Sequence, residues 1–521
     1  MRFRIEVHDG FARLGSIDGL KTPHIIDLRN REEIRFFRDA VERKPPDIAE
    51  KLFPGSADFL KKEGFVKKII FKGTQSGEFV RAISERDDFK RPLYIPLIAS
   101  PQNLSLLIYA GADLLDNAYA LLKAHEGVFL TEIGEFELDR LKEVPCHCLA
   151  CTGREDYGNE YDYLADHNTY ALKRELLLAV KMLKSDRLRE LVEQRVKSNP
   201  ELTAVLRILD SKTANSSLFP RFRKSKLLPT SDDSPGRAEI QYYFTRLPEV
   251  YDPASSVCLL IPCSAKKPYM VSRTHRILRS RLGNAIKGVN EIIISSPFVS
   301  PRELELIYPI SSYDTPTTGI WSEWEIEFVS SKLAPLIESF EKIYAYLHGG
   351  YRKVAERAGK IAGADIEFID DVTRLRKKLE SEEKTGFDLY REIFSHMVRY
   401  QFGVDFEIEK IKGRYPSLEF FKRDRVARVD MKYGNLDIYG ELAIYLKDRK
   451  VFWVEIEDFE VRGTIFSVGV KSADPVIRPN DVTVYYSSDT IGVGRALMPG
   501  KLMGVVDGKA VESRRKIIFA E

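Results

Sequence analysis

Residues 257–269 read Val-Cys-Leu-Leu-Ile-Pro-Cys-Ser-Ala-Lys-Lys-Pro-Tyr, and this stretch decides the fold of the middle of the chain. Its first five residues are apolar and predict a buried β-strand. A loop follows at once and places the Cys263 thiol beside a hydroxyl, two ammonium groups and, soon afterwards, the His275 imidazole. Because ligands of open α/β sheets bind beyond the carboxyl ends of the strands, this loop is predicted to carry chemistry.

The residues around this stretch repeat the order strand, loop, helix. Strands are expected at 257–261, 291–296, 343–348 and 365–369, and helices at 274–286, at 323–342 and after Gly349-Gly350. Such alternation predicts a Rossmann-like parallel sheet that is covered by helices. The glycine pair before a helix is weak evidence for a phosphate site, and nothing in the sequence matches a P-loop.

Composition restricts the class of protein. A chain of 521 residues is too long for one hydrophobic core, so three or four domains are expected. Since 81 Lys and Arg are balanced by 78 Asp and Glu, a nucleic-acid surface has to be a local patch. No apolar stretch reaches the roughly 20 residues that cross a bilayer, and no signal-peptide pattern begins the chain. These features predict a cytoplasmic protein without a membrane partner.

Shifts of composition along the chain predict its domains. A polar stretch at 198–237, which ends in the loop-forming run 230–236, is typical of a linker. We expect a zinc-containing βα domain at 1–197, a linker at 198–251, an α/β catalytic core at 252–385, a small α+β domain at 386–446 and a small β-barrel at 447–521.

Three of the five cysteines stand within six positions. Cys146, Cys148 and Cys151, together with His167, offer three thiolates and an imidazole, a set that binds Zn²⁺ tetrahedrally. Four protein ligands close the coordination sphere, so the metal is expected to be structural. The alternative is a cluster of reduced thiols that pack as small hydrophobic groups. His147 is the competing imidazole, but its place between two ligands would strain the loop.

The motif Pro-Cys-Ser-Ala-Lys-Lys-Pro-Tyr, followed by Ser-Arg-Thr-His at 272–275, resembles the core motif of the archaeosine synthases, tRNA-modifying relatives of the tRNA-guanine transglycosylases. The resemblance continues through 296–305, 308–314 and 318–322. Upstream, the cysteine cluster and the His-Asn pair at 167–168 look like the metal site of transglycosylases. The resemblance covers nearly the whole chain.

The N-terminal part departs from the transglycosylase pattern. Residues 111–119 look like the segment that bears the nucleophilic aspartate of those enzymes, which would be Asp116 here. Their following Pro-Thr-Arg stretch is replaced by Ala-Leu-Leu-Lys at 120–123, and their Asp-Ser-Gly-Gly motif has no counterpart. We therefore expect an incomplete or remodelled barrel that has lost base exchange and serves RNA docking or assembly. Asp116 is either a substrate-binding carboxylate or a residue that caps a turn.

The last 75 residues resemble a PUA domain, a β-barrel that many RNA-modifying enzymes append. Its expected phosphate contacts are Arg495, Lys501, Lys509, Arg514 and Arg515. RNA is recognised largely through its shape and backbone, so no base preference is predicted. For each of these residues the alternative is a solvated basic face.

The resemblance implies an enzyme that adds an amine, free lysine, to the nitrile of 7-cyano-7-deazaguanine at position 15 of tRNA and forms an amidine. In some lineages of the family a radical S-adenosylmethionine partner then cleaves the adduct. Glutamine or ammonia as donor, and a homodimeric assembly, stay open. Two other functions are also open, a non-catalytic subunit that presents tRNA to a partner enzyme and an active tRNA-guanine transglycosylase.

The residues of the core suggest two chemical routes. In the first, Cys263 attacks the nitrile carbon to give a thioimidate that the amine displaces. In the second, the amine attacks directly while Ser264 or Lys266 polarises the nitrile. Lys266, Lys267 or His275 is expected to lower the pKa of the thiol and to donate the proton to the nitrile nitrogen. Glu303, Asp314 and Arg302 are the candidates that hold the amine donor, and Asp314 is also the expected general base.

Overall fold

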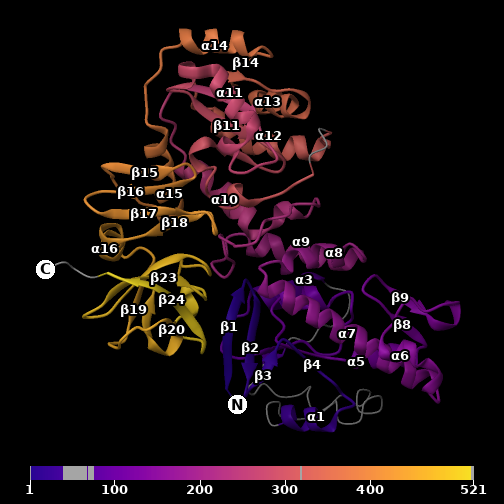
Figure 1. Ribbon diagram of the computed structural model, residues 1–521. Helices are drawn as coiled ribbons and strands as arrows, with labels where there is room; N and C mark the ends of the chain where they lie inside the picture. The colour runs from indigo at the N-terminus through magenta and orange to yellow at the C-terminus, as the bar shows by residue number, and fades with distance from the viewer. Residues whose placement is uncertain (1, 39–66, 69–75, 317–319, 518–521) are drawn as a thin grey trace. The chain divides into compact units, whose positions relative to one another are not determined.

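The computed structural model describes residues 2–38, 67–68, 76–316 and 320–517 (Figure 1). They form two compact units. The first consists of Met1–Pro220, Val454–Pro479 and Arg495–Ser513, and the second of Arg221–Trp453, Asn480–Gly494 and Arg514–Glu521. Among the described residues, no helix is both long and apolar enough to cross a membrane.

Two small sheets build the N-terminal part of the first unit. The antiparallel sheet has the order β1-β2-β3, and the parallel sheet has the order β4-β7-β6-β5. The strands are β1 (Phe3–Asp9), β2 (Ala12–Ile17), β3 (Leu20–Thr22), β4 (His24–Ile26), β5 (Lys67–Lys68), β6 (Leu93–Tyr94) and β7 (Leu114–Asp116). The parallel strands are short, and α5 (Ala118–His125) follows β7 directly, as expected for a remodelled transglycosylase-like βα domain.

A buried ion pair joins the antiparallel hairpin to the parallel sheet. The Arg13 guanidinium on β2 contacts the Asp113 carboxylate, and both side chains are almost fully buried. Arg13 also donates to the Phe89 carbonyl at 2.7 Å, and Asp113 accepts from the Leu93 amide at 2.7 Å. A buried charge needs such partners, so this cluster fixes the hairpin against the sheet.

Helices make up most of the rest of the first unit. Helices α7 (Glu160–Lys184) and α8 (Leu188–Val196) are separated by a short turn in which Asp186 has the left-handed conformation. The predicted linker also differs from the structure. It contains α9 (Pro200–Thr213) in the first unit, which has Asn199 as its N-cap and Pro200 in its first turn, and α10 (Ala238–Val250) in the second unit.

The second unit contains the predicted Rossmann-like sheet. Its order is β12-β11-β10-β13-β14, in which β11, β10, β13 and β14 are mutually parallel and the edge strand β12 is antiparallel. The strands are β10 (Val257–Pro262), β11 (Asn290–Ile294), β12 (Val299–Pro301), β13 (Lys342–Ala345) and β14 (Ile366–Phe368). Burial on both faces explains the unbroken apolar run of β10. The edge strand β12 was not predicted.

Helices cover this sheet (Figure 1). They are α11 (Arg273–Leu282), α12 (Glu323–Ile337), α13 (Gly349–Ala362) and α14 (Val372–Ser381). Ser322 and Glu325 close a capping box at the start of α12, because each side chain accepts from the backbone N–H of the other residue. Buried Ser330 on α12 donates to the Val354 carbonyl of α13, which ties these two helices together.

A small α+β part follows within the second unit. An antiparallel sheet of order β15-β16-β17-β18 is accompanied by two helices. The elements are α15 (Leu389–Phe402), β15 (Lys410–Arg414), β16 (Ser417–Phe421), β17 (Arg425–Asp430), β18 (Asn435–Ile438) and α16 (Gly440–Asp448). Buried Gln401 on α15 exchanges two hydrogen bonds with the backbone of Leu436, which anchors the helix on β18.

The last part of the chain is a sheet of order β20-β24-β23-β22-β19-β21. Its strands are β19 (Trp453–Ile456), β20 (Thr464–Phe466), β21 (Val470–Ala473), β22 (Val482–Tyr486), β23 (Ile491–Ala496) and β24 (Lys509–Lys516). The predicted fold class is therefore confirmed, from the transglycosylase-like βα domain through the parallel-sheet core to the C-terminal all-β part.

Replacing Arg13 with Met tests the buried ion pair. The change leaves the Asp113 charge buried without its partner, so we expect it to destabilise β2 and β7 locally by about 3–5 kcal/mol. Hydrogen exchange at the amides of these strands measures the loss. Lys21→Met, on the exposed face of β3, is the matched control and should leave exchange unchanged. Equal exchange in both variants would refute the assigned role.

Candidate functional site

Cys263 lies where the order of the parallel sheet reverses. It follows the central strand β10 directly, and its amide donates to the Ile294 carbonyl of β11 at 2.9 Å. On the other side of β10 lies β13, whose chain continues into α13. Connections from neighbouring strands diverge at such a switch point and leave a crevice beyond their carboxyl ends, which is the usual ligand site of this architecture. The predicted position of Cys263 is therefore matched by the topology.

A cavity of about 300 Å³ opens at this point. Its described lining combines Cys263 with two indoles, a phenol, two carboxylates and several hydroxyls. The segments that contribute run from 229 to 235, from 295 to 297 and from 315 to 325, in addition to Tyr351. No Lys or Arg belongs to the described lining. The cavity thus offers flat apolar walls and acceptors of hydrogen bonds, which suits a planar base together with a cationic group.

The Cys263 thiol has two polar neighbours. The Tyr351 hydroxyl on α13 lies 3.4 Å from its Sγ, within hydrogen-bonding distance for sulfur. The Lys267 ammonium lies 3.9 Å above the centre of the Tyr313 ring and interacts electrostatically with Cys263. Burial lowers the pKa of Lys267, while Cys263 opposes that shift. The thiolate is the form in which cysteine is nucleophilic.

Gly350 shapes one wall of the cavity. A Cβ at this position would lie 2.3 Å from the indole ring of Trp321, so only glycine lets the ring pack against the first turn of α13. Trp321 in turn contacts the Tyr351 ring edge-on, with centroids 5.0 Å apart. The glycine pair noted in the sequence therefore serves ring packing at the cavity wall.

Asp232 and Glu325 are the carboxylates of the described lining. Glu325 is engaged, since it accepts from Ser296 Oγ at 2.7 Å and from the Ser322 amide at 2.8 Å. Asp232 is exposed at the cavity, and among the described residues it has neither a hydrogen bond nor an ion pair. It is therefore the carboxylate that is available to a substrate. It comes from the segment that the sequence predicts as a linker.

Three further predicted residues lie on the loops around Cys263 but outside the cavity lining. Asp314 is more than half exposed and lies 3.3 Å from the Lys226 ammonium, with which it forms an ion pair. Lys266 is exposed. The Ser264 hydroxyl donates to the Lys266 carbonyl at 3.1 Å, which shapes the loop. Lys267 is thus the lysine of the motif that is coupled to the thiol.

His275 and Arg302 belong to a buried network behind the loop. Arg302 donates to Glu291 at 2.6 Å, to Glu305 at 2.6 Å and to His275 Nδ1 at 2.9 Å. Burial, and then the Arg302 charge, lower the pKa of His275 to about 3, and its Nε2 donates to the Pro262 carbonyl at 3.0 Å. All three guanidinium nitrogens of Arg302 donate to protein groups. His275 and Arg302 therefore support the loop from behind, whereas the sequence predicted that they would act on the substrates.

Glu303 is also buried and outside the cavity. It accepts from Asn290 Nδ2 at 2.9 Å, and burial raises the pKa of its carboxyl to about 7. Its neighbour along the chain, Arg302, faces the network described above. The expectation that Arg302 and Glu303 hold the amine donor therefore has no support in their positions. Both side chains are buried and bind other protein groups.

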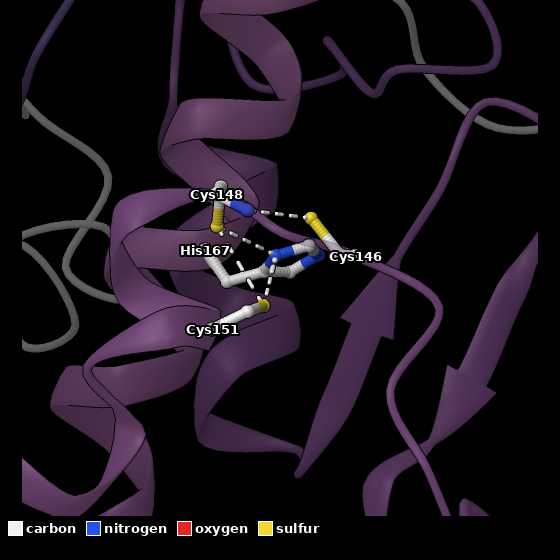
Figure 2. A group of neighbouring side chains, drawn as sticks. All are labelled: Cys146, Cys148, Cys151 and His167. Carbon is white, nitrogen blue, oxygen red and sulfur yellow. Dashed lines mark hydrogen bonds between the residues drawn. The ribbon is translucent and has the colours of Figure 1, made fainter.

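The predicted metal ligands converge in the first unit. Figure 2 shows the thiols of Cys146, Cys148 and Cys151 gathered around the imidazole of His167, which projects from α7. The four ligand atoms lie within 4.8 Å of one another. Cys148 Sγ is 3.6 Å from Cys151 Sγ and 3.5 Å from His167 Nδ1, and Cys151 Sγ is 3.3 Å from that nitrogen. The cluster is able to hold a metal ion.

These distances fit the edges of a metal tetrahedron. Metal–sulfur and metal–nitrogen bonds of about 2.3 and 2.0 Å give edges of about 3.8 Å between sulfurs and about 3.5 Å between sulfur and nitrogen. His167 Nε2 donates to the Leu130 carbonyl at 3.0 Å, which leaves Nδ1 as the lone-pair nitrogen toward the thiols. Metal-bound histidines are commonly oriented by such a second hydrogen bond. The competing His147 is not part of this cluster.

Asp116, at the end of β7, is completely buried. It accepts from the Tyr94 hydroxyl at 2.6 Å and from the amides of Leu97 and Ala118 at 3.1 and 2.9 Å. Burial raises its pKa, and these hydrogen bonds oppose the shift. Its surroundings match the turn-capping alternative that the sequence leaves open.

The five predicted RNA contacts differ in exposure. Arg495 is completely buried, which removes it from an RNA surface. Arg515 donates to Asp437 at 2.6 Å, and Arg514 lies 3.4 Å from Asp430, so both guanidiniums are occupied within the second unit. Lys501 is exposed and Lys509 is half-buried. A basic residue in a strand is often a partner of buried carboxylates, which sequence alone does not reveal.

Sequence reasoning missed Asp232, Tyr351 and Trp321 as cavity residues. Asp232 stands in a run of turn-forming residues that gives no chemical signal. Tyr351 follows the glycine pair, and this position at the start of a helix after a parallel strand is a usable signal in retrospect. Trp321 lies inside the family-like stretch at 318–322, of which Thr318 and Gly319 lie outside the described residues.

Comparisons with known proteins agree with these features. Family models match a domain of unknown function (DUF5591) at residues 240–383, a pre-PUA domain at 387–447 and queuine tRNA-ribosyltransferase at 73–201. The chain also resembles a crystal structure of a protein of unknown function, with 46% identity, a TM-score of 0.48, and coverage of 53% of this chain and 100% of that one.

Two curated relatives match over most of their length. Archaeosine synthase subunit alpha of Methanosarcina acetivorans is 33% identical over 449 residues, which is 79% of this chain and 72% of the relative. Archaeosine synthase of Haloferax volcanii is 33% identical over 586 aligned residues, which is 98% of each chain. The chain therefore belongs to the archaeosine synthase family.

Proposed function

We propose that this chain modifies tRNA in archaeosine biosynthesis by adding an amine, free lysine, to the nitrile of 7-cyano-7-deazaguanine at position 15. The observation that carries the proposal is the placement of the Cys263 thiol in an aromatic cavity at the switch point of the parallel sheet. A nitrile carbon is an electrophile, and a thiolate is a suitable side chain to attack it. The family membership supplies the tRNA context.

The proposed reaction has two steps that balance. The Cys263 thiolate forms a bond to the nitrile carbon, and one proton adds to the nitrile nitrogen, which gives a thioimidate. The neutral amine then adds to the same carbon, loses a proton and expels the thiolate. The product is an amidine, and Cys263 is regenerated without an oxidant or reductant.

The cavity supplies groups for both steps. Tyr351, 3.4 Å from the thiol, donates a hydrogen bond to the departing or attacking sulfur. Asp232, which is unpaired among the described residues, is the proposed base that takes the proton from the amine. The planar base is proposed to rest against the Trp321 ring. The flipped-out base would be read from its edge within this space.

A radical S-adenosylmethionine enzyme is the proposed partner for the following step. A lysine-substituted amidine has to lose its substituent before it becomes an unsubstituted amidine. Cleavage of an unactivated carbon–nitrogen bond requires a reactive cofactor, which a radical S-adenosylmethionine enzyme would supply. The proposed product of this chain is the lysine-substituted adduct.

Nucleoside mass spectrometry tests the reaction. We expect tRNA that carries the nitrile base, incubated with the purified chain and free lysine, to yield a nucleoside heavier by one lysine. Cys263→Ser should abolish the adduct, because an alcohol is far less ionised than a thiol at neutral pH. Full activity of that variant would eliminate the thioimidate route. No adduct with lysine, glutamine or ammonium would overturn the transferase proposal.

Asp232→Asn tests the proposed base. The amide keeps the shape of the side chain but cannot accept the proton, so we expect the rate of adduct formation to fall about 10²- to 10⁴-fold. Single-turnover kinetics with saturating lysine measures this rate. Asp314→Asn is the matched control, because Asp314 is exposed and outside the cavity lining. A larger loss in the Asp314 variant would transfer the role to that residue.

The metal of the cysteine cluster is proposed to be structural Zn²⁺. Three thiolates and one imidazole saturate a tetrahedral ion, so no position is left for a substrate. We expect elemental analysis to find one zinc per chain, and Cys148→Ser or His167→Ala to lose it and to increase proteolysis of the first unit. Cys263→Ser is the control and should retain the metal. Full zinc content in the Cys148 and His167 variants would contradict the assignment.

A further inference from the structure

A second cavity lies in the second unit, separate from the one that contains Cys263. Its volume is about 420 Å³, and its lining comes from α11, the start of α15 and the turn between β15 and β16. We infer that this cavity binds one nucleotide of the tRNA, with its phosphodiester on arginine side chains and its base against tyrosine rings. The inference rests on the proposed function for its RNA ligand and assigns a contact outside the C-terminal domain.

Helix α11 supplies most of the positive charge. Its sequence from Arg273 to Leu282 contains four arginines and no acidic residue. Arg276 and Arg279 are three positions apart, so they lie on the same face of the helix, and both line the cavity. Arg414, from the end of β15, lines it from another side. Guanidiniums from two elements thus converge on one space.

Arg276 and Arg414 are available to an anion. Both side chains are exposed, and among the described residues neither forms an ion pair or a hydrogen bond. Arg279 contacts Glu291, yet burial and the nearby Arg302 charge lower its pKa to about 10. The lining contains one carboxylate, Asp388, among the described residues. The local balance of charge is therefore positive.

Asp388 does not cancel this charge. Its carboxylate accepts from the Tyr390 amide at 3.0 Å and caps α15, and it also lies 3.7 Å from the Arg391 guanidinium. It is thereby committed to the helix start and to a basic neighbour. A phosphodiester on Arg276 and Arg414 would meet Asp388 as the one carboxylate of the described lining, and that carboxylate already has these two partners. A planar guanidinium is well suited to bind two phosphate oxygens at once.

Tyr390 and Tyr415 provide the aromatic part of the site. Their rings are nearly parallel, with an interplanar angle of 15° and centroids 6.2 Å apart. Tyr390 is 38% exposed, whereas the Tyr415 hydroxyl contacts buried Glu305. The Tyr415 ring is thus held in place through its hydroxyl, and the Tyr390 ring faces solvent. Unpaired RNA bases commonly stack on such rings, which an isolated phosphate ion would not need.

The site is mechanically connected to the reactive loop. Met270 and Val271, which line the cavity, follow the Cys263 motif directly in the chain. The Met270 amide donates to Glu305 Oε1 at 3.2 Å, the same carboxylate that Tyr415 contacts. A nucleotide bound here therefore lies against the continuation of the loop that carries the thiol. This placement suits a contact that positions tRNA for the reaction.

Binding of an unmodified tRNA transcript tests the site without turnover. We expect Arg276→Ala/Arg414→Ala to weaken binding roughly tenfold and to lower the slope of log K against log [salt] by about one to two units, since about one unit is lost with each phosphate contact. Tyr390→Ala should weaken binding roughly tenfold, while Tyr390→Phe should bind as the native chain does, because the ring is what stacks. Filter binding over a salt series measures both quantities.

Arg281→Ala is the matched control, because Arg281 is exposed on the same helix but does not line the cavity. Native affinity and an unchanged salt slope in the double arginine variant would overturn the site while the proposed reaction stands. An equal loss in the Arg281 variant would also overturn it, because it would indicate a diffuse basic surface. If the native chain adds lysine to tRNA and the Tyr390→Ala variant binds tRNA with native affinity, the stacking contact is overturned.

Discussion

The buried Arg302 guanidinium is the constraint on which the reactive region depends. It donates to Glu291, to Glu305 and to His275, and each partner holds a different part of the core. His275 passes the interaction to the Pro262 carbonyl, immediately before Cys263. Glu305 holds the Met270 amide on the far side of the same motif. Removing a buried charge from such a set would leave its partners uncompensated, so the loop is braced at both ends.

The low pKa of His275 belongs to this arrangement. Burial and the Arg302 charge keep the imidazole neutral at physiological pH, with Nδ1 as acceptor and Nε2 as donor. A neutral ring in a fixed tautomer gives a constant hydrogen bond to Pro262 and no titration near neutrality. The groups nearer to Cys263 are Tyr351 and Asp232, which line the cavity, and Lys267, which lies outside its described lining. Residues within the motif thus divide into Cys263, which is open to the cavity, and His275, which is buried and braces the loop.

Local patterns in the sequence predicted the scaffold better than the site. The apolar run at 257–261 and the alternation after it determine the parallel sheet, because burial on both faces leaves a signal in every residue of a strand. The cysteine spacing predicted the metal cluster for a similar reason, since its ligands are close in sequence. Asp232 could not be predicted, because the long loop between α9 and α10 brings it to the cavity and no local pattern indicates the course of that loop. The predictions for Arg302 and Arg495 were wrong, because sequence does not distinguish an exposed charged side chain from a buried one.

The two units divide the features of the family between them. The first keeps a transglycosylase-like scaffold with its cysteine and histidine cluster, yet Asp116 at the expected nucleophile position is enclosed by three donors. A nucleophile needs an accessible lone pair, and a carboxylate without exposed surface does not offer one. The second unit has an accessible thiol at a switch point, where parallel strands leave space for a ligand. The accessible thiol therefore lies in the unit that the transglycosylase-like match at 73–201 does not cover, and the proposed nucleophile is placed there.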